Sequence, residues 1–315
     1  MRVCLILLLA GLVGCAVQSR SGRDFVAETD ADVAELTARG TAHSLAAAAL
    51  LSFVQTALHS RGPAQVQKPT RAQALMKQAV ALAPDQQPLA YLQWRECAES
   101  CADAELVRIH LQVLAPDNGL VWLPELTAAW EKGDASAVTR AVAKIGAARR
   151  MSMYFNALTV MLVDELGGIE KNPIESMIRA MSISALFTPH LQSMSQPCRV
   201  DQFDQPGRRE ACEAMTARMT ESDTALMQGL GITIQEKWWP AGSPEREKLG
   251  EQRRQFDYVG RASAPIRILH MEKDWAERLD ALRNSNREID ANRMMLAFYH
   301  LPLERPTDWK DPYAR

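Results

Sequence analysis

The residues with the clearest chemistry in the body of the chain are four cysteines: Cys97, Cys101, Cys198 and Cys212. An even number of cysteines in an exported protein favours disulfide bonds over free thiols. We expect two local pairs: Cys198 with Cys212 around a polar loop, and Cys97 with Cys101 across a helix–loop corner. A zinc site is an alternative for the second pair, but it needs His110 and a fourth ligand that the sequence does not offer. Free buried cysteines are the third alternative.

The histidines form no motif typical of catalysis or metal binding, and they are scattered along the chain: His43, His59, His110, His190, His270 and His300. There is no HExxH pair, no glycine-rich phosphate loop and no G-x-S-x-G elbow. Glu272 and Asp274 lie next to His270, but helix capping explains these carboxylates more simply than catalysis. The methionines between 151 and 181 have helical spacing and are interpreted as core residues, with copper or haem ligation as the alternative. We therefore expect no catalytic residue, cofactor or metal.

Two groups of aromatic residues could contact a partner. Trp238 and Trp239 are adjacent in a predicted loop, where both side chains cannot easily be buried, although local packing is the alternative. Tryptophan is favoured at the centres of binding surfaces. The second group belongs to a predicted concave helical face and consists of Tyr91, Trp94 and Trp130, with core packing as the alternative for each of them.

The segment that precedes these residues begins with MRVCLILLLAGLVGC. Its apolar stretch suits a signal peptide and is too short for a helix that spans a bilayer, which needs roughly 20 residues. The end of the segment, Leu12-Val13-Gly14-Cys15, resembles the lipobox of bacterial lipoproteins. This resemblance implies that Cys15 is lipidated, and Ala16 after it favours sorting to the outer membrane, facing the periplasm. An ordinary secretory peptide and an uncleaved anchor are the alternatives.

The charge balance argues against a nucleic-acid partner. The chain has 36 Lys+Arg against 38 Asp+Glu, whereas non-specific nucleic-acid binding needs a basic face. Hydrophobic residues make up 47% of the sequence and aromatic residues only 6%, with alanine and leucine dominant. No later segment alternates like a strand, so we expect a globular all-α body.

A repeated tetrapeptide indicates stacked helix pairs. Leu82-Ala83-Pro84-Asp85 recurs as Leu114-Ala115-Pro116-Asp117, 32 residues later. Thr70 and Gln73 form a capping box, and Pro84 ends the helix that follows it. The apolar face of that helix is expected to consist of Ala72, Leu75, Met76, Ala79, Leu82 and Ala83.

Residues 70–148 resemble the tetratricopeptide repeat. The second-helix pattern of that family is matched by Ala72, Met76, Ala79, Val80, Leu82 and Pro84, and its first helix and turn by Trp122, Ala128, Gly133 and Asp134. Glu125 stands where the family prefers leucine, and the helix that ends near Arg149-Arg150 lacks the closing proline. The resemblance implies a solenoid of helical hairpins with a surface that holds peptides.

Further helices are expected in the second half of the chain. Gly167-Gly168 ends one, another runs from Pro173 to about Leu186, and Ser243-Pro244 starts a third. Asp274 with Glu277 is expected to start a fourth, and the proline-rich tail is expected to lie extended over the surface.

These observations divide the chain into four parts: a signal peptide (1–14), a lipidated tether (15–23), a helical repeat-like region (24–166) and a C-terminal helical region packed on it (167–315). The sequence favours an envelope-anchored protein that acts through protein contacts, as a scaffold or assembly factor, held to the membrane by its lipid. A periplasmic immunity or inhibitor lipoprotein is the alternative, and an enzyme with an unrecognised site is a third.

Overall fold

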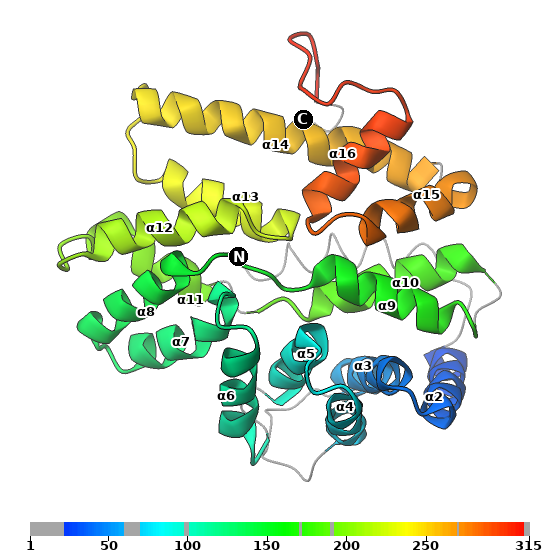
Figure 1. Ribbon diagram of the computed structural model, residues 1–315. Coiled ribbons are helices and arrows are strands. Elements are labelled where there is room, and N and C mark those ends of the chain that lie inside the picture. Colours follow the sequence, from blue (N-terminus) through cyan, green and yellow to red (C-terminus); the bar gives the residue numbers. More distant parts are fainter. Residues whose placement is uncertain are drawn as a thin grey trace.

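The computed structural model describes residues 22–59, 70–97, 101–169, 172–189, 192–269 and 271–311. The regular elements in these ranges are helices and none is a strand, which confirms the all-α class (Figure 1). The α-helices are α2 (Gly22–Arg39), α3 (Ala42–His59), α4 (Arg71–Leu82), α5 (Gln87–Cys97), α6 (Ala104–Leu114), α7 (Leu123–Glu131), α8 (Ala135–Ala147), α9 (Phe155–Leu166), α10 (Pro173–Leu186), α11 (Gln192–Ser195), α12 (Arg208–Thr220), α13 (Ala225–Glu236), α14 (Pro244–Leu269), α15 (Met271–Arg283) and α16 (Glu288–Phe298). Short 3₁₀ helices are η1 (Gly119–Trp122), η2 (Gln196–Cys198) and η3 (Val200–Gln202).

The N-terminal helices pack as consecutive neighbours, with α3 between α2 and α4. Every residue of α3 from Leu45 to Leu51 is buried, as its alanine-rich composition predicts. Helix α2 begins at Gly22, so the last two residues of the predicted tether, Gly22 and Arg23, lie in a helix instead. The signal peptide, Cys15 and the remainder of the tether lie outside the described residues.

Helix α4 has the predicted start and end. The Thr70 hydroxyl accepts from the Gln73 N–H (3.2 Å), and the Gln73 side chain accepts from the Thr70 N–H (3.0 Å). The helix ends at Leu82, ahead of Pro84. Its buried face includes Leu75 and Met76, but the prediction that Leu82 is buried is wrong, since this side chain is 59% exposed. It borders a shallow hollow of about 400 Å³ between the ends of α2, α3 and α4.

The solenoid stacking implied by the repeat is not confirmed. Gly133 turns the chain between α7 and α8 with a φ of 68°, and the Asp134 carboxylate caps α8 by accepting from the Ala137 N–H (2.9 Å), as predicted. However, α8 also packs on α12, and α9 packs on both α3 and α15. In a solenoid each repeat contacts only its neighbours. Helices α2 to α13 and α15 therefore share one core, whereas α14 and α16 contribute buried residues to two smaller clusters.

Helices α8 and α12 approach each other closely at Gly146. A Cβ atom at Gly146 would lie 2.7 Å from the Cβ of Ala214 and 2.8 Å from the backbone nitrogen of Met215. The same crossing is held by Arg208, a fully buried side chain whose guanidinium donates to Thr139 Oγ1 (2.9 Å) and to the Ala135 carbonyl (2.7 Å). This crossing joins the repeat-like region to the C-terminal half.

The C-terminal helices largely keep their predicted bounds. Helix α9 ends before Gly167, α10 spans Pro173–Leu186, and the Ser243 hydroxyl caps α14 by accepting from the Arg246 N–H (3.2 Å). Asp274 has a non-helical backbone that kinks α15, which agrees with a helix start at this residue. No helix in the described ranges has the length and apolar character needed to cross a membrane.

The close approach at Gly146 predicts opposite effects for two glycine substitutions. Gly146→Ala should lower the free energy of unfolding by about 1–3 kcal/mol, because the overlap outweighs the better helix propensity of alanine. Gly260→Ala in α14, where no atom lies within 4 Å of the added Cβ, should raise it by up to about 1 kcal/mol. Urea unfolding of both variants measures the difference, and equal effects would contradict the crossing.

Candidate functional site

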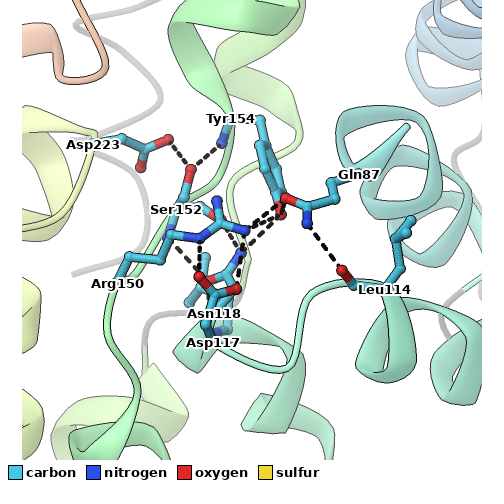
Figure 2. A network of polar contacts seen from close by, with 9 residues as sticks. Gln87, Leu114, Asp117, Asn118, Arg150, Ser152, Tyr154 and Asp223 are labelled. Carbon is cyan, nitrogen blue, oxygen red and sulfur yellow. Dashed lines mark hydrogen bonds and ion pairs between the residues drawn. The ribbon is translucent and has the colours of Figure 1, made fainter. Parts of the chain in front are cut away.

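A network of polar side chains joins four segments at the centre of the molecule (Figure 2). Arg150, which follows α8, forms a bidentate pair with Asp117, with Nε 3.1 Å and Nη2 3.3 Å from the carboxylate oxygens. Its Nη2 also donates to Gln87 Oε1 (2.6 Å) at the start of α5. The hydrogen bond from Arg150 lowers the pKa of Asp117, so the pair stays ionised at neutral pH.

Asn118 connects two stretches of irregular backbone in this network. Its side-chain oxygen accepts from the N–H groups of Leu120 (3.2 Å) and Ser152 (3.0 Å), and its Nδ2 donates to the Ser152 carbonyl (2.8 Å). The side chain is fully buried, and all of these groups would be costly to leave without a hydrogen bond. Asn118 thus makes the hydrogen bonds of backbone N–H and carbonyl groups that have no partner within a helix.

Asp223, between α12 and α13, caps the start of α9 from a distant part of the sequence. Its carboxylate accepts from the Met153 N–H (2.9 Å), the Phe155 N–H (3.2 Å) and the Ser152 hydroxyl (2.8 Å). Burial raises the pKa of Asp223, and the hydrogen bond from the Met153 N–H opposes this shift. The positive end of the α9 dipole also favours a carboxylate at this place.

Tyr154 occupies a left-handed backbone conformation directly before α9, with a φ of 57°. This conformation is unfavourable for a bulky residue and persists only where surrounding contacts enforce it. Its N–H donates to Ser152 Oγ (3.1 Å), its ring packs on Tyr91 at 5.6 Å, and its hydroxyl lies 3.3 Å from Arg150 Nη2. The network therefore sets the direction in which the chain enters α9.

The arrangement supports a structural junction better than a catalytic centre. The hydroxyls of Ser152 (2.8 Å) and Ser222 (3.3 Å) both donate to the Asp223 carboxylate, and that carboxylate already accepts hydrogen bonds from backbone N–H groups. A serine nucleophile needs a base that is free to take its proton. No histidine takes part in the hydrogen bonds of this network, within the part of the chain that the structure describes.

The cysteines lie in the two expected pairs. The sulfur atoms of Cys97 and Cys101 are 2.20 Å apart and those of Cys198 and Cys212 are 1.93 Å apart, which are disulfide distances. Cys97 and Cys101 also lie near the carboxylate of Asp103, the arrangement of a small metal site. The paired sulfurs are not free thiolates, however, and Asp103 forms an ion pair with Lys77 (2.9 Å). His110, the further ligand of the zinc alternative, does not belong to this cluster.

The predicted contact residues differ in their surroundings. For Tyr91 and Trp94 the core-packing alternative is the one observed, because these side chains are only 1% and 8% exposed. Tyr91 donates its hydroxyl proton to the Phe187 carbonyl (3.0 Å), and Trp94 packs on its ring, so both belong to the core. Trp130 is half-buried and packs against the same core.

The two adjacent tryptophans are both half-buried. Trp238 donates its indole N–H to the Cys198 carbonyl (2.7 Å) and packs edge-on against Phe203. Trp239 lies under the guanidinium of Arg209 at 5.0 Å. Local packing therefore accounts for Trp238, and Trp239 retains a partly accessible ring.

The residues of the polar network were not identified from the sequence. The only local signal at Asp223 is the run Ser222-Asp223-Thr224, which is typical of a helix start. Thr224 makes that local cap on α13, with its hydroxyl accepting from the Met227 N–H (3.3 Å), while Asp223 caps α9. Local spacing does not reveal a cap made from 70 residues away.

Comparison with known proteins adds no assignment, since no family model, curated protein or solved structure matches this chain.

The Asp223 cap predicts a large loss of stability on its removal. Asp223→Ala leaves the N–H groups of Met153 and Phe155 buried without their acceptor, which should cost about 2–5 kcal/mol. Asp164→Ala removes the exposed partner of Arg283 and should change stability by less than about 1 kcal/mol. Thermal unfolding of the two variants tests the cap, and a loss as small as that of the control would contradict it.

The raised pKa of Glu96, which is next to the Cys97–Cys101 pair, predicts that stability depends on pH. Burial raises the pKa of Glu96 from 4.5 to about 8, so the folded chain binds more protons than the unfolded chain between these values. The free energy of unfolding should therefore fall as the pH rises through this window. Glu96→Gln removes the titrating group and should flatten this part of the stability curve, measured by urea unfolding at pH 5 to 9. An unchanged slope in the variant would show that other groups cause it.

Proposed function

We propose that this chain is a lipid-anchored protein of the bacterial cell envelope, held at the outer membrane and facing the periplasm, that acts by binding another protein. The sequence Leu12-Val13-Gly14-Cys15 supports the anchor, since it places a cysteine at the position that is lipidated in bacterial lipoproteins. The pairing of Cys97 with Cys101 and of Cys198 with Cys212 supports an oxidising compartment, where disulfides persist.

The observation that supports a binding function most directly is the outer face of α6. Leu106, Ile109 and Val113 are 68%, 43% and 76% exposed. Val107 and Leu111, on the opposite face of the helix, are buried in the core. An apolar spacing of three and four residues is the pattern by which one helix packs against another. We therefore infer that the partner presents an amphipathic helix to this face of α6.

The anchor is tested by Cys15→Ala, because acylation needs the thiol of this residue. The variant should leave the membrane fraction, whereas the unaltered chain should remain there after a high-salt wash that removes proteins bound by charge alone. Fractionation followed by detection of the chain measures this. A variant that stays with the membranes after the wash would exclude a lipid anchor at Cys15.

The binding function is tested by placing charges on α6. The double change Leu106→Glu with Val113→Glu should abolish capture of a specific partner from envelope extract. It should change stability by less than about 0.5 kcal/mol per site, since both side chains are exposed. Val200→Glu, at an apolar residue outside α6 that is 55% exposed, is the control and should retain the partner.

A panel of hydrolase substrates is measured beside these variants. Turnover that disappears with one ionisable residue while the fold is retained would overturn the binding function in favour of an enzyme.

A further inference from the structure

The C-terminal tail, residues 301–311, turns away from α16 at His300 and returns to α14 (Figure 1). The side-chain amide of Gln255 on α14 makes two hydrogen bonds to the tail backbone. Its Nε2 donates to the Leu303 carbonyl (3.0 Å), and its Oε1 accepts from the Arg305 N–H (2.9 Å). One turn further along α14, the Tyr258 hydroxyl donates to the Pro302 carbonyl (2.6 Å). The tail thus runs along α14 with a bend at 303–304 and a turn in which the Trp309 N–H donates to the Pro306 carbonyl (3.1 Å).

These contacts depend little on the sequence of the tail. Three hydrogen bonds involve only its backbone, and the side chains of Leu301 and Leu303 remain exposed. Main-chain hydrogen bonds to an extended segment are a general mode of peptide recognition, in which side-chain contacts add the specificity. Another segment could make the same three hydrogen bonds.

Two tail side chains give the site its specificity. The Trp309 ring packs edge-on against the Tyr258 ring at 5.2 Å, and Asp311 forms an ion pair with Arg261 of α14. Pro302 and Pro306 restrict the backbone around these contacts, which lowers the entropy lost on binding. A segment with prolines and a tryptophan at this spacing fits the site.

The fit of the tail is incomplete at Arg305. The Nε atom of this side chain is buried and has no hydrogen-bond partner among the described residues. An unsatisfied buried donor weakens binding. A lysine in this position keeps the positive charge and places a methylene group where the guanidinium Nε lies, so it avoids the unsatisfied donor.

We propose that Gln255, Tyr258 and Arg261 on α14 form a binding site for a proline- and tryptophan-containing segment of another protein, and that the tail of this chain occupies the site until such a segment displaces it. This surface is distinct from the α6 face. The proposal concerns a second contact of the same protein, and its test uses synthetic peptides in place of the α6 partner. Failure of one proposal can therefore be distinguished from failure of the other.

The covalent link gives the tail an advantage over any free competitor. A tethered segment acts at an effective concentration in the millimolar range. A free peptide with the sequence LPLERPTDWKD, residues 301–311, should therefore bind the unaltered chain weakly. Trp309→Ala in the full-length chain loosens the tail and leaves the three α14 residues intact, so it should increase the affinity for the labelled peptide about tenfold or more.

The experiment measures fluorescence anisotropy of the labelled peptide with full-length variants whose fold is checked by circular dichroism. Adding Gln255→Ala to the Trp309→Ala chain should lower the affinity about tenfold, the effect of losing two hydrogen bonds of ordinary strength. Gln252→Ala, at an exposed glutamine of the same helix, is the matched control and should leave it unchanged.

Two modified peptides test the same contacts by changes in the peptide. N-methylation at the Arg305 position removes the N–H that donates to Gln255 Oε1 and should weaken binding. Lysine at that position should strengthen it. Absence of peptide binding to the Trp309→Ala chain would overturn the proposal, since the tail would then be a fixed part of the fold. Equal affinity with and without Gln255, or with and without N-methylation, would also overturn it.

Discussion

The contact on which the arrangement of the helices depends is the carboxylate of Asp223 at the start of α9. Helix α9 packs on α3, α10 and α15, so its position affects both halves of the molecule. Asp223 accepts from the N–H of Phe155, the first residue of α9, and from the N–H of Met153, two residues before the helix. The Asp223 carbonyl also accepts from the Glu288 N–H (2.7 Å) at the start of α16. One residue therefore couples α9, the α12–α13 connection and α16, and the energetic cost of burying its charge is offset by the donors around it.

Structure that depends on neighbouring residues could be predicted from the sequence. The Thr70 and Asp134 caps each act on a residue three positions away, so the spacing alone identifies them. Pro84 ends α4 through its own backbone properties, and α9 ends before Gly167 as predicted, although Gly167 keeps a right-handed φ of −61°. The two cysteine pairs also belong to this class, because each joins residues that are close along the chain. The helical class and many helix bounds follow from such short-range rules.

Burial and long-range caps could not be predicted in this way, because distant helices decide them. The sequence leaves open whether Tyr91 lies on a concave face or in the core, and it lies in the core, where it contacts Tyr154 and Phe187 from segments over 60 residues away. Leu82 continues the apolar period of α4, yet it is exposed because a hollow lies beside that end of the helix. The Asp223 cap is hard to predict because its position in the sequence is typical of a cap on α13. Its carboxylate oxygens instead accept hydrogen bonds at the start of α9.

The same polar network explains why the surface is the place to look for function. Asp117, Asn118, Arg150 and Asp223 are all ionisable or polar groups near the centre, but their hydrogen-bonding groups are used in joining backbone segments. A group that activates a substrate must exchange a proton or a ligand. If one of these groups did so, the folded chain would lose hydrogen bonds that stabilise it. Asp117 and Arg150 are partly accessible, and each already has the other as an ionic partner. The contacts proposed for this chain therefore involve side chains outside this network, namely the apolar face of α6 and the α14 side chains that bind the tail backbone.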